Sequence, residues 1–73
     1  MSNFTLKNWQ LDRGVYISPR FGDIGTFNRY KTFFIRAGIF ADCDEGNRII
    51  KIPVSHHSSA YKNKESLEKL NLI

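Results

Sequence analysis

The sequence has few of the residues that staple a small fold or anchor it in a membrane. Cys43 is the single cysteine among 73 residues, so no disulfide can form within the chain and a disulfide-stapled secreted scaffold is excluded. No apolar run approaches the roughly 18 residues that a membrane span needs. Residues 1–11 lack the basic segment followed by an apolar segment that marks a signal peptide, and we therefore expect a cytoplasmic protein without a membrane partner.

The chain is also short of the length that a large core requires. Its 73 residues predict a single domain over residues 1–73, because a chain of this size buries only about 60% of the surface that it exposes when unfolded. Such a domain can rarely spare residues for a deep catalytic cleft. We therefore expect a non-enzymatic protein that acts through a shallow binding face, with no cofactor and no small-molecule substrate.

Aromatic residues and positive charge are what the sequence has in plenty. Ten aromatic residues make up 14% of the chain, which argues against disorder because disordered segments lack aromatics. The eleven Lys and Arg exceed the seven Asp and Glu, for a net charge of +4. This excess favours an acidic or polyanionic partner, although solubility alone would also account for it.

Hydrophobic alternation predicts a β-hairpin in the second half of the chain. Within residues 30–41, Phe33, Ile35, Ala37 and Ile39 alternate with more polar positions, which is typical of a half-exposed strand. A second strand is predicted over residues 48–54, ending near Pro53. The polar residues 42–47 between them predict the turn.

The remaining elements are shorter. Residues 4–7 and 15–17 predict strands, with a bulge or turn near Asn8, and residues 19–26 predict a loop. Asn63 is the predicted cap of a C-terminal helix that carries Leu67, Leu70 and Ile73 at three-residue steps. The fold class that follows is α+β: a small three- or four-stranded antiparallel sheet with a short C-terminal helix.

Two groups of residues resemble metal-binding or catalytic motifs without matching them fully. Residues 42–47 resemble a calcium loop, but the glycine falls one position early and position twelve is Pro53. Cys43 with His56 and His57 lacks the four ligands of structural zinc and shows no orienting partner for a cysteine nucleophile. We therefore expect no metal and no catalytic residue. A small hydrolase using Cys43 with His56 or His57 stays as a third hypothesis, after the two binding functions described below.

The pattern that points most directly to function is a mixture of basic and aromatic residues between positions 13 and 36, in which arginine outnumbers lysine. Arginine and aromatic side chains are the usual anchors of protein interfaces, and they also serve phosphate neutralisation and base stacking. The candidate partner-binding residues are Arg13, Tyr16, Arg20, Phe21, Arg29, Tyr30, Lys31 and Arg36.

Two functions and one structural explanation follow from this segment. The first function is a protein-binding regulator. The second is a small sheet-based nucleic-acid-binding protein in which Tyr16, Phe34 or Trp9 stacks on bases. The structural explanation is a small core built from aromatics and surrounded by solvated charges.

In length, single-domain build and the character of the sequence from residues 1–7 through the Arg and aromatic segment, the chain resembles small phage-encoded regulators of bacterial RNA polymerase. The resemblance implies a monomeric host-takeover protein that binds the polymerase β and β′ subunits in the host cytoplasm. It implies transcription inhibition or antitermination through protein–protein contact, without a cofactor.

Overall fold

The computed structural model describes residues 5–55 and 58–73, and only the backbone of residues 58–61. It contains a four-stranded antiparallel sheet in the order β1-β2-β4-β3. The strands are β1 (Gln10–Asp12), β2 (Val15–Ile17), β3 (Asp42–Asp44) and β4 (Ile49–Pro53), and the helices are α1 (Ile24–Arg36) and α2 (Ser58–Lys69). The predicted α+β class, with its antiparallel sheet and short C-terminal helix, is confirmed.

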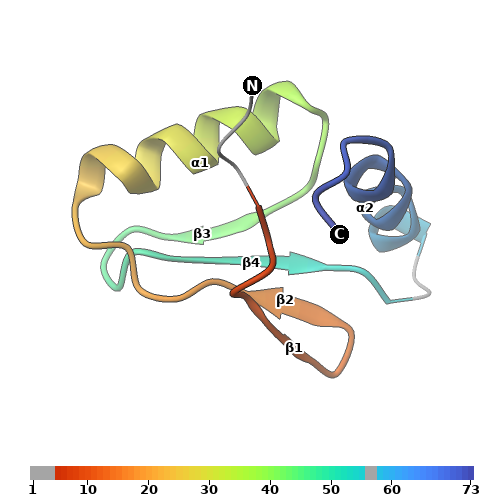
Figure 1. Ribbon diagram of the computed structural model, residues 1–73, viewed down its shortest axis with the longest axis horizontal. Coiled ribbons are helices and arrows are strands. Elements are labelled where there is room, and N and C mark those ends of the chain that lie inside the picture. Colours follow the sequence, from red (N-terminus) through yellow and green to blue (C-terminus); the bar gives the residue numbers. More distant parts are fainter. Residues whose placement is uncertain (1–4, 56–57) are drawn as a thin grey trace.

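The two helices lie over different parts of the sheet. Figure 1 shows α1 above β3 and β4, and α2 beside the far end of β4, while the β1–β2 hairpin lies farthest from α1. Among the described residues, no helix is long and apolar enough to cross a membrane.

The hairpin that joins β1 to β2 has a loop of only two residues. Arg13 (φ 52°) and Gly14 (φ 76°) both adopt positive φ, and Asp12 pairs with Val15 across the loop. Two consecutive positive φ values define the type I′ turn, whose twist matches that of paired strands. β1 was not predicted, although the turn near Asn8 is confirmed. The strand predicted over residues 4–7 is wrong for Thr5 to Lys7, and Phe4 lies outside the described residues.

The helix α1 corrects the strand predicted over residues 30–41. Residues 30–36 belong to the helix, and residues 37–41 form a turn and an irregular segment before β3. Phe27 and Phe34 are both 0% exposed, and with Tyr30 between them they follow the helical spacing of three and four residues. The loop predicted over residues 19–26 is correct up to Asp23, which caps the helix.

The predicted hairpin is confirmed in its second strand only. β4 matches the strand predicted over residues 48–54, and β2 matches the strand predicted over 15–17. The first strand of the hairpin is β3, inside the segment that was predicted to be the turn, and the turn itself is at residues 45–48. Polar Asp42 and Asp44 flank Cys43 in β3, so no apolar alternation marks this strand.

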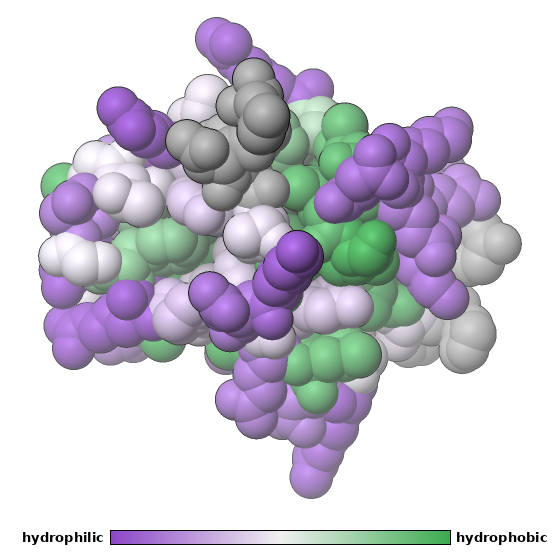
Figure 2. All heavy atoms as spheres, in the orientation of Figure 1, coloured by the Kyte–Doolittle hydropathy of each residue, from purple (hydrophilic) through white to green (hydrophobic). Residues whose placement is uncertain are grey.

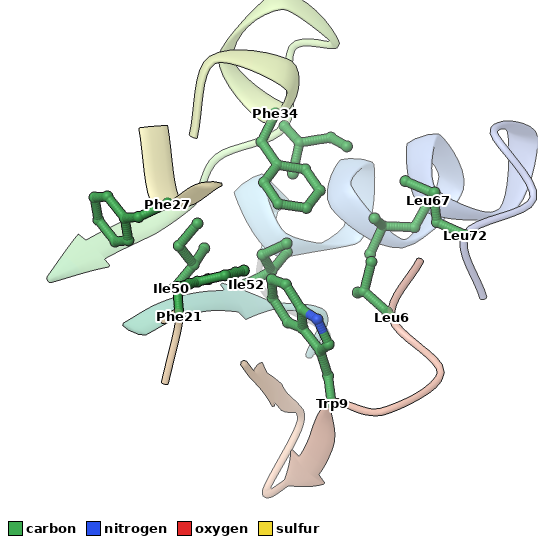
Figure 3. Packing of buried hydrophobic residues seen from close by; sticks show 10 residues of the cluster. Leu6, Trp9, Phe21, Phe27, Phe34, Ile50, Ile52, Leu67 and Leu72 are labelled. Carbon is green, nitrogen blue, oxygen red and sulfur yellow. The ribbon is translucent and has the colours of Figure 1, made fainter. Parts of the chain in front are cut away.

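A single aromatic-rich core joins these elements. Trp9 contacts Phe34 with ring centroids 5.8 Å apart and Phe21 at 6.4 Å, both edge to face. The fully buried Ile50 and Ile52 come from β4. Figure 3 shows these side chains converging between the strands and the helices. Edge-to-face aromatic pairs contribute about 0.5–1.5 kcal/mol each beyond their buried area.

The α2 helix begins earlier than predicted, and Asn63 is not its cap. Asn63 lies inside the helix and is 1% exposed. Its Nδ2 donates to the carbonyl oxygens of Phe40 and Pro53, each at 2.9 Å, and its Oδ1 accepts from the Phe40 N–H at 2.8 Å. Leu67 is buried, but Leu70 is 44% exposed and Ile73 is 43% exposed. The three-residue spacing therefore did not identify the packed face, and Asn63 instead ties α2 to the segment after α1 and to the end of β4.

Candidate functional site: the arginine face of α1

The outward side of α1 forms a shallow basic surface, which we call the arginine face. A groove of about 450 Å³ runs along it. The residues that line the groove are Gly25, Asn28, Arg29, Thr32, Phe33 and Arg36. Because Phe27 and Phe34 point into the core from the opposite side of the helix, this row of residues is turned away from the sheet.

The charge on this face has one sign. No Asp or Glu occurs from residue 24 to residue 41. Arg29 and Arg36 are both exposed and lie about two helical turns apart, on one side of the helix. Arg36 is in the last turn, where a cation is stabilised by the partial negative charge of the helix C-terminus. The face therefore presents two cations that suit an acidic surface.

Lys31 has a different position. Its Nζ lies 3.1 Å from Glu45 Oε1 in the turn between β3 and β4. Both side chains are partly exposed, so the ion pair contributes at most about 1 kcal/mol to the stability of the fold. Lys31 thus contacts the chain's own acidic turn, whereas Arg29 and Arg36 lie on the arginine face.

Two large apolar side chains are exposed near the C-terminal end of α1. Ile35 is 63% exposed and Phe40 is 62% exposed. The Phe40 backbone is fixed by its two hydrogen bonds to Asn63, so its position is set by the fold. Exposed apolar residues beside arginine are typical of protein-binding surfaces.

The other end of α1 is organised by Asp23. Its Oδ1 accepts a hydrogen bond from the Thr26 N–H at 2.6 Å. This bond to the Thr26 backbone, with that residue's hydroxyl also contributing, holds the pKa of the Asp23 carboxyl below its usual value of 3.8. A charged cap at the N-terminus stabilises the helix that carries Arg29 and Arg36.

The structure divides the predicted partner-binding residues among several places. Phe21 is buried and packs edge to face on Phe27, and Tyr30 packs against the core. Arg20 is exposed in the loop before α1. Arg13 and Tyr16 lie on the β1–β2 hairpin, far from α1 in Figure 1. Only Arg29 and Arg36 share the arginine face, and the partner-binding role of all these residues remains a prediction.

The aromatic residues proposed for base stacking are mostly in the core. Trp9 is 9% exposed and Phe34 is 0% exposed, so neither can stack on a base while the domain is folded. Tyr16 is half-buried in β2. The structure thus places only one of the three proposed stacking residues at the surface.

The residues proposed for hydrolase or metal chemistry are Cys43, His56 and His57. Partial burial raises the pKa of the Cys43 thiol above 9.0, and the nearby Asp42 and Glu45 add to the increase while Lys31 opposes it. A higher pKa leaves less of the reactive thiolate at neutral pH. His56 and His57 lie outside the described residues. Within residues 5–55 and 58–73, no three His, Cys, Asp or Glu side chains form a group that could hold a metal ion.

The sequence matches no known protein-family model, no curated protein and no solved structure. The arginine face was missed in the sequence because residues 30–41 were interpreted as a strand. The spacing of Phe27, Tyr30 and Phe34, with Asp23 before them, is the signal that would have located it.

Proposed function

We propose that this chain is a non-enzymatic protein-binding regulator and that the arginine face of α1 contacts an acidic surface of its partner. The observation that carries the proposal is the exposed pair Arg29 and Arg36 on a helix without a single acidic residue. Arginine presents a planar fork that pairs with carboxylates in a bidentate manner. The exposed Ile35 and Phe40 add apolar contact area of the kind found at protein interfaces.

Bacterial RNA polymerase, through its β and β′ subunits, is the partner that we propose, with inhibition of initiation or antitermination as the effect. Support for this target comes from the resemblance to small phage-encoded regulators and from the basic helix face. The host cytoplasm is the compartment that the proposal requires. Partial burial raises the pKa of the Cys43 thiol, and the smaller thiolate fraction at neutral pH fits a role without covalent catalysis.

The test is direct binding of the chain to purified bacterial RNA polymerase by biolayer interferometry at low and high salt. The variant R29E/R36E reverses both charges of the arginine face. We expect it to bind at least about tenfold more weakly than the parent chain, because each lost charge-assisted contact is worth on the order of 1 kcal/mol or more. Binding of the parent chain should also weaken with salt.

The α2 helix offers a matched control. Lys62 and Lys69 are exposed and have the same seven-residue spacing as Arg29 and Arg36, and Lys69 is likewise in the last turn of its helix. The variant K62E/K69E therefore makes the same change in net charge and the same unfavourable contact with a helix C-terminus. We expect it to bind polymerase within about twofold of the parent chain. Circular dichroism and a urea titration establish that both variants fold.

Each outcome decides a separate part of the proposal. No binding of the parent chain to polymerase rules out this target. Equal binding by folded R29E/R36E rules out the arginine face, and equal losses in both variants show that net charge alone is responsible. Tight, salt-dependent binding to a single-stranded oligonucleotide, in place of polymerase, would support the nucleic-acid alternative.

A further inference from the structure

A second groove lies on another part of the molecule, between the β1–β2 hairpin, the end of β4 and the C-terminal segment. Its volume is about 440 Å³. The apolar residues that line it are Leu11, Tyr16, Val54 and Ile73. Leu11 is 56% exposed and Ile73 is 43% exposed, so two large apolar side chains face solvent at a hollow rather than on a convex surface.

The surface view agrees with this arrangement. Figure 2 shows apolar surface over the C-terminal segment and again over the β1–β2 hairpin, with less apolar residues between them. The hairpin, β4 and α2 are fixed to one another. The Val54 N–H donates to the Gly14 carbonyl at 2.7 Å, Tyr16 pairs with Ile52, and Asn63 Nδ2 on α2 donates to the Pro53 carbonyl at 2.9 Å. A groove with hydrogen-bonded walls is largely formed before a ligand binds.

The charged side chains that line this groove are also of one sign. Arg13, at the tip of the hairpin, and Lys64, on α2, are the charged residues that line it, and both are exposed. No acidic residue is among its lining residues. The combination of an apolar floor with two cations complements a molecule that has an apolar body and an anionic head.

We propose that this groove binds a small amphiphilic carboxylate, with the apolar body against Leu11, Val54 and Ile73 and the carboxylate between Arg13 and Lys64. The volume is within the range of about 300–1,000 Å³ that small-molecule sites occupy. The molecule is bound and released unchanged, which makes it a ligand rather than a substrate. The groove is separate from the arginine face, and this proposal does not depend on the function proposed for the arginine face.

The test uses octanoate as the probe, with uncharged 1-octanol of the same chain length as its partner. In ¹⁵N-labelled protein, octanoate should shift the backbone amide signals of Leu11, Gly14, Tyr16 and Val54 in a saturable manner, while the signals of α1 should stay in place. Octanol should bind on the order of tenfold more weakly, because its hydroxyl carries no negative charge to pair with Arg13 and Lys64.

The variants separate the cationic contacts from the fold. R13N/K64Q removes both charges, and Asn tolerates the positive φ that residue 13 adopts. It should weaken octanoate binding on the order of tenfold. K62Q/K69Q removes two charges from α2 at positions that do not line the groove and should leave octanoate binding unchanged.

Four results would overturn the proposal. The first is the absence of saturable shifts, or shifts spread over the whole domain. The second is equal binding of octanol and octanoate, and the third is unchanged octanoate binding in folded R13N/K64Q. The fourth is occupation of the groove by something else. If the same signals shift with protein concentration alone, a second copy of the chain occupies the groove. If an acetylated Asp–Leu peptide saturates the groove and octanoate does not, the groove binds a protein partner.

Discussion

Replacing Asn63 with alanine should destabilise the domain strongly, although Asn63 lines neither of the two proposed sites. The side chain is 1% exposed and makes three hydrogen bonds of 2.8–2.9 Å to Phe40 and Pro53. These bonds connect α2 to the segment after α1 and to the end of β4, so their loss loosens three elements together.

The magnitude follows from those three bonds. Each contributes about 1 kcal/mol net, and a buried partner left unsatisfied costs a further 1–3 kcal/mol unless water reaches it. We therefore expect Asn63→Ala to lower the free energy of unfolding by about 3 kcal/mol. That is a large share of the few kcal/mol that hold a domain of this size together.

Urea unfolding followed by Trp9 fluorescence measures this change, because Trp9 is the only tryptophan and is buried. Asn28→Ala is the matched control, since Asn28 is an exposed asparagine in α1, and it should stay within about 0.5 kcal/mol of the parent chain. If Asn63→Ala lost no more stability than Asn28→Ala, Asn63 would not bridge these elements as the structure has it.

Three further predictions concern the turn, the thiol and the helix cap. Gly14→Ala should lower the urea midpoint by the equivalent of about 1–2 kcal/mol, because Gly14 has φ +76° and an added Cβ would lie 3.0 Å from Ser55 Cβ. Gly22→Ala is the control and should leave the midpoint nearly unchanged, because an added Cβ there meets open space. Equal midpoints for the two variants would contradict the strain at Gly14. Cys43 should react with iodoacetamide more slowly than a free model thiol at pH 8 and faster after unfolding in urea, because burial raises its pKa; a folded protein that reacts faster than the model thiol would show the reverse. The pKa of Asp23 is lowered in the folded state, so its ionised carboxylate stabilises the fold at pH values above its ordinary pKa of 3.8. This contribution is lost as the pH falls through the folded-state pKa. Urea midpoints between about pH 2 and pH 6 should therefore fall less steeply with acid in Asp23→Asn, and identical pH profiles would refute the effect.

The segment from residue 24 to residue 41 shows where the sequence was ambiguous. Phe33, Ile35, Ala37 and Ile39 alternate as in a strand, while Phe27, Tyr30 and Phe34 follow a helical period. Aromatic and β-branched residues favour strands, so local preference supported the wrong alternative. The helix buries Phe27 and Phe34 together, which outweighs the exposure of Ile35 that the helix also imposes.

The candidate sites were predictable to different degrees. The arginine and aromatic mixture was visible in the sequence, but a strand would have put Phe34 and Arg36 on the same face, whereas the helix turns Phe34 into the core and Arg36 outward. The groove between the β1–β2 hairpin and the C-terminal segment was not predictable, because Leu11, Val54 and Ile73, which line it, come from distant parts of the chain.

The sequence by itself determined the α+β class, the strands β2 and β4, the presence of a C-terminal helix and the arginine-weighted basic charge, because these follow from composition and from apolar spacing within short windows. Only the tertiary structure decided the state of residues 24–36, the role of Asn63 and the division of the basic residues between two surfaces. The physical reason is that these features depend on contacts between residues far apart in the chain. From its neighbours in the sequence, Asn63 is a typical helix cap. Only the approach of Phe40 and Pro53 makes it a buried residue that hydrogen-bonds two other segments.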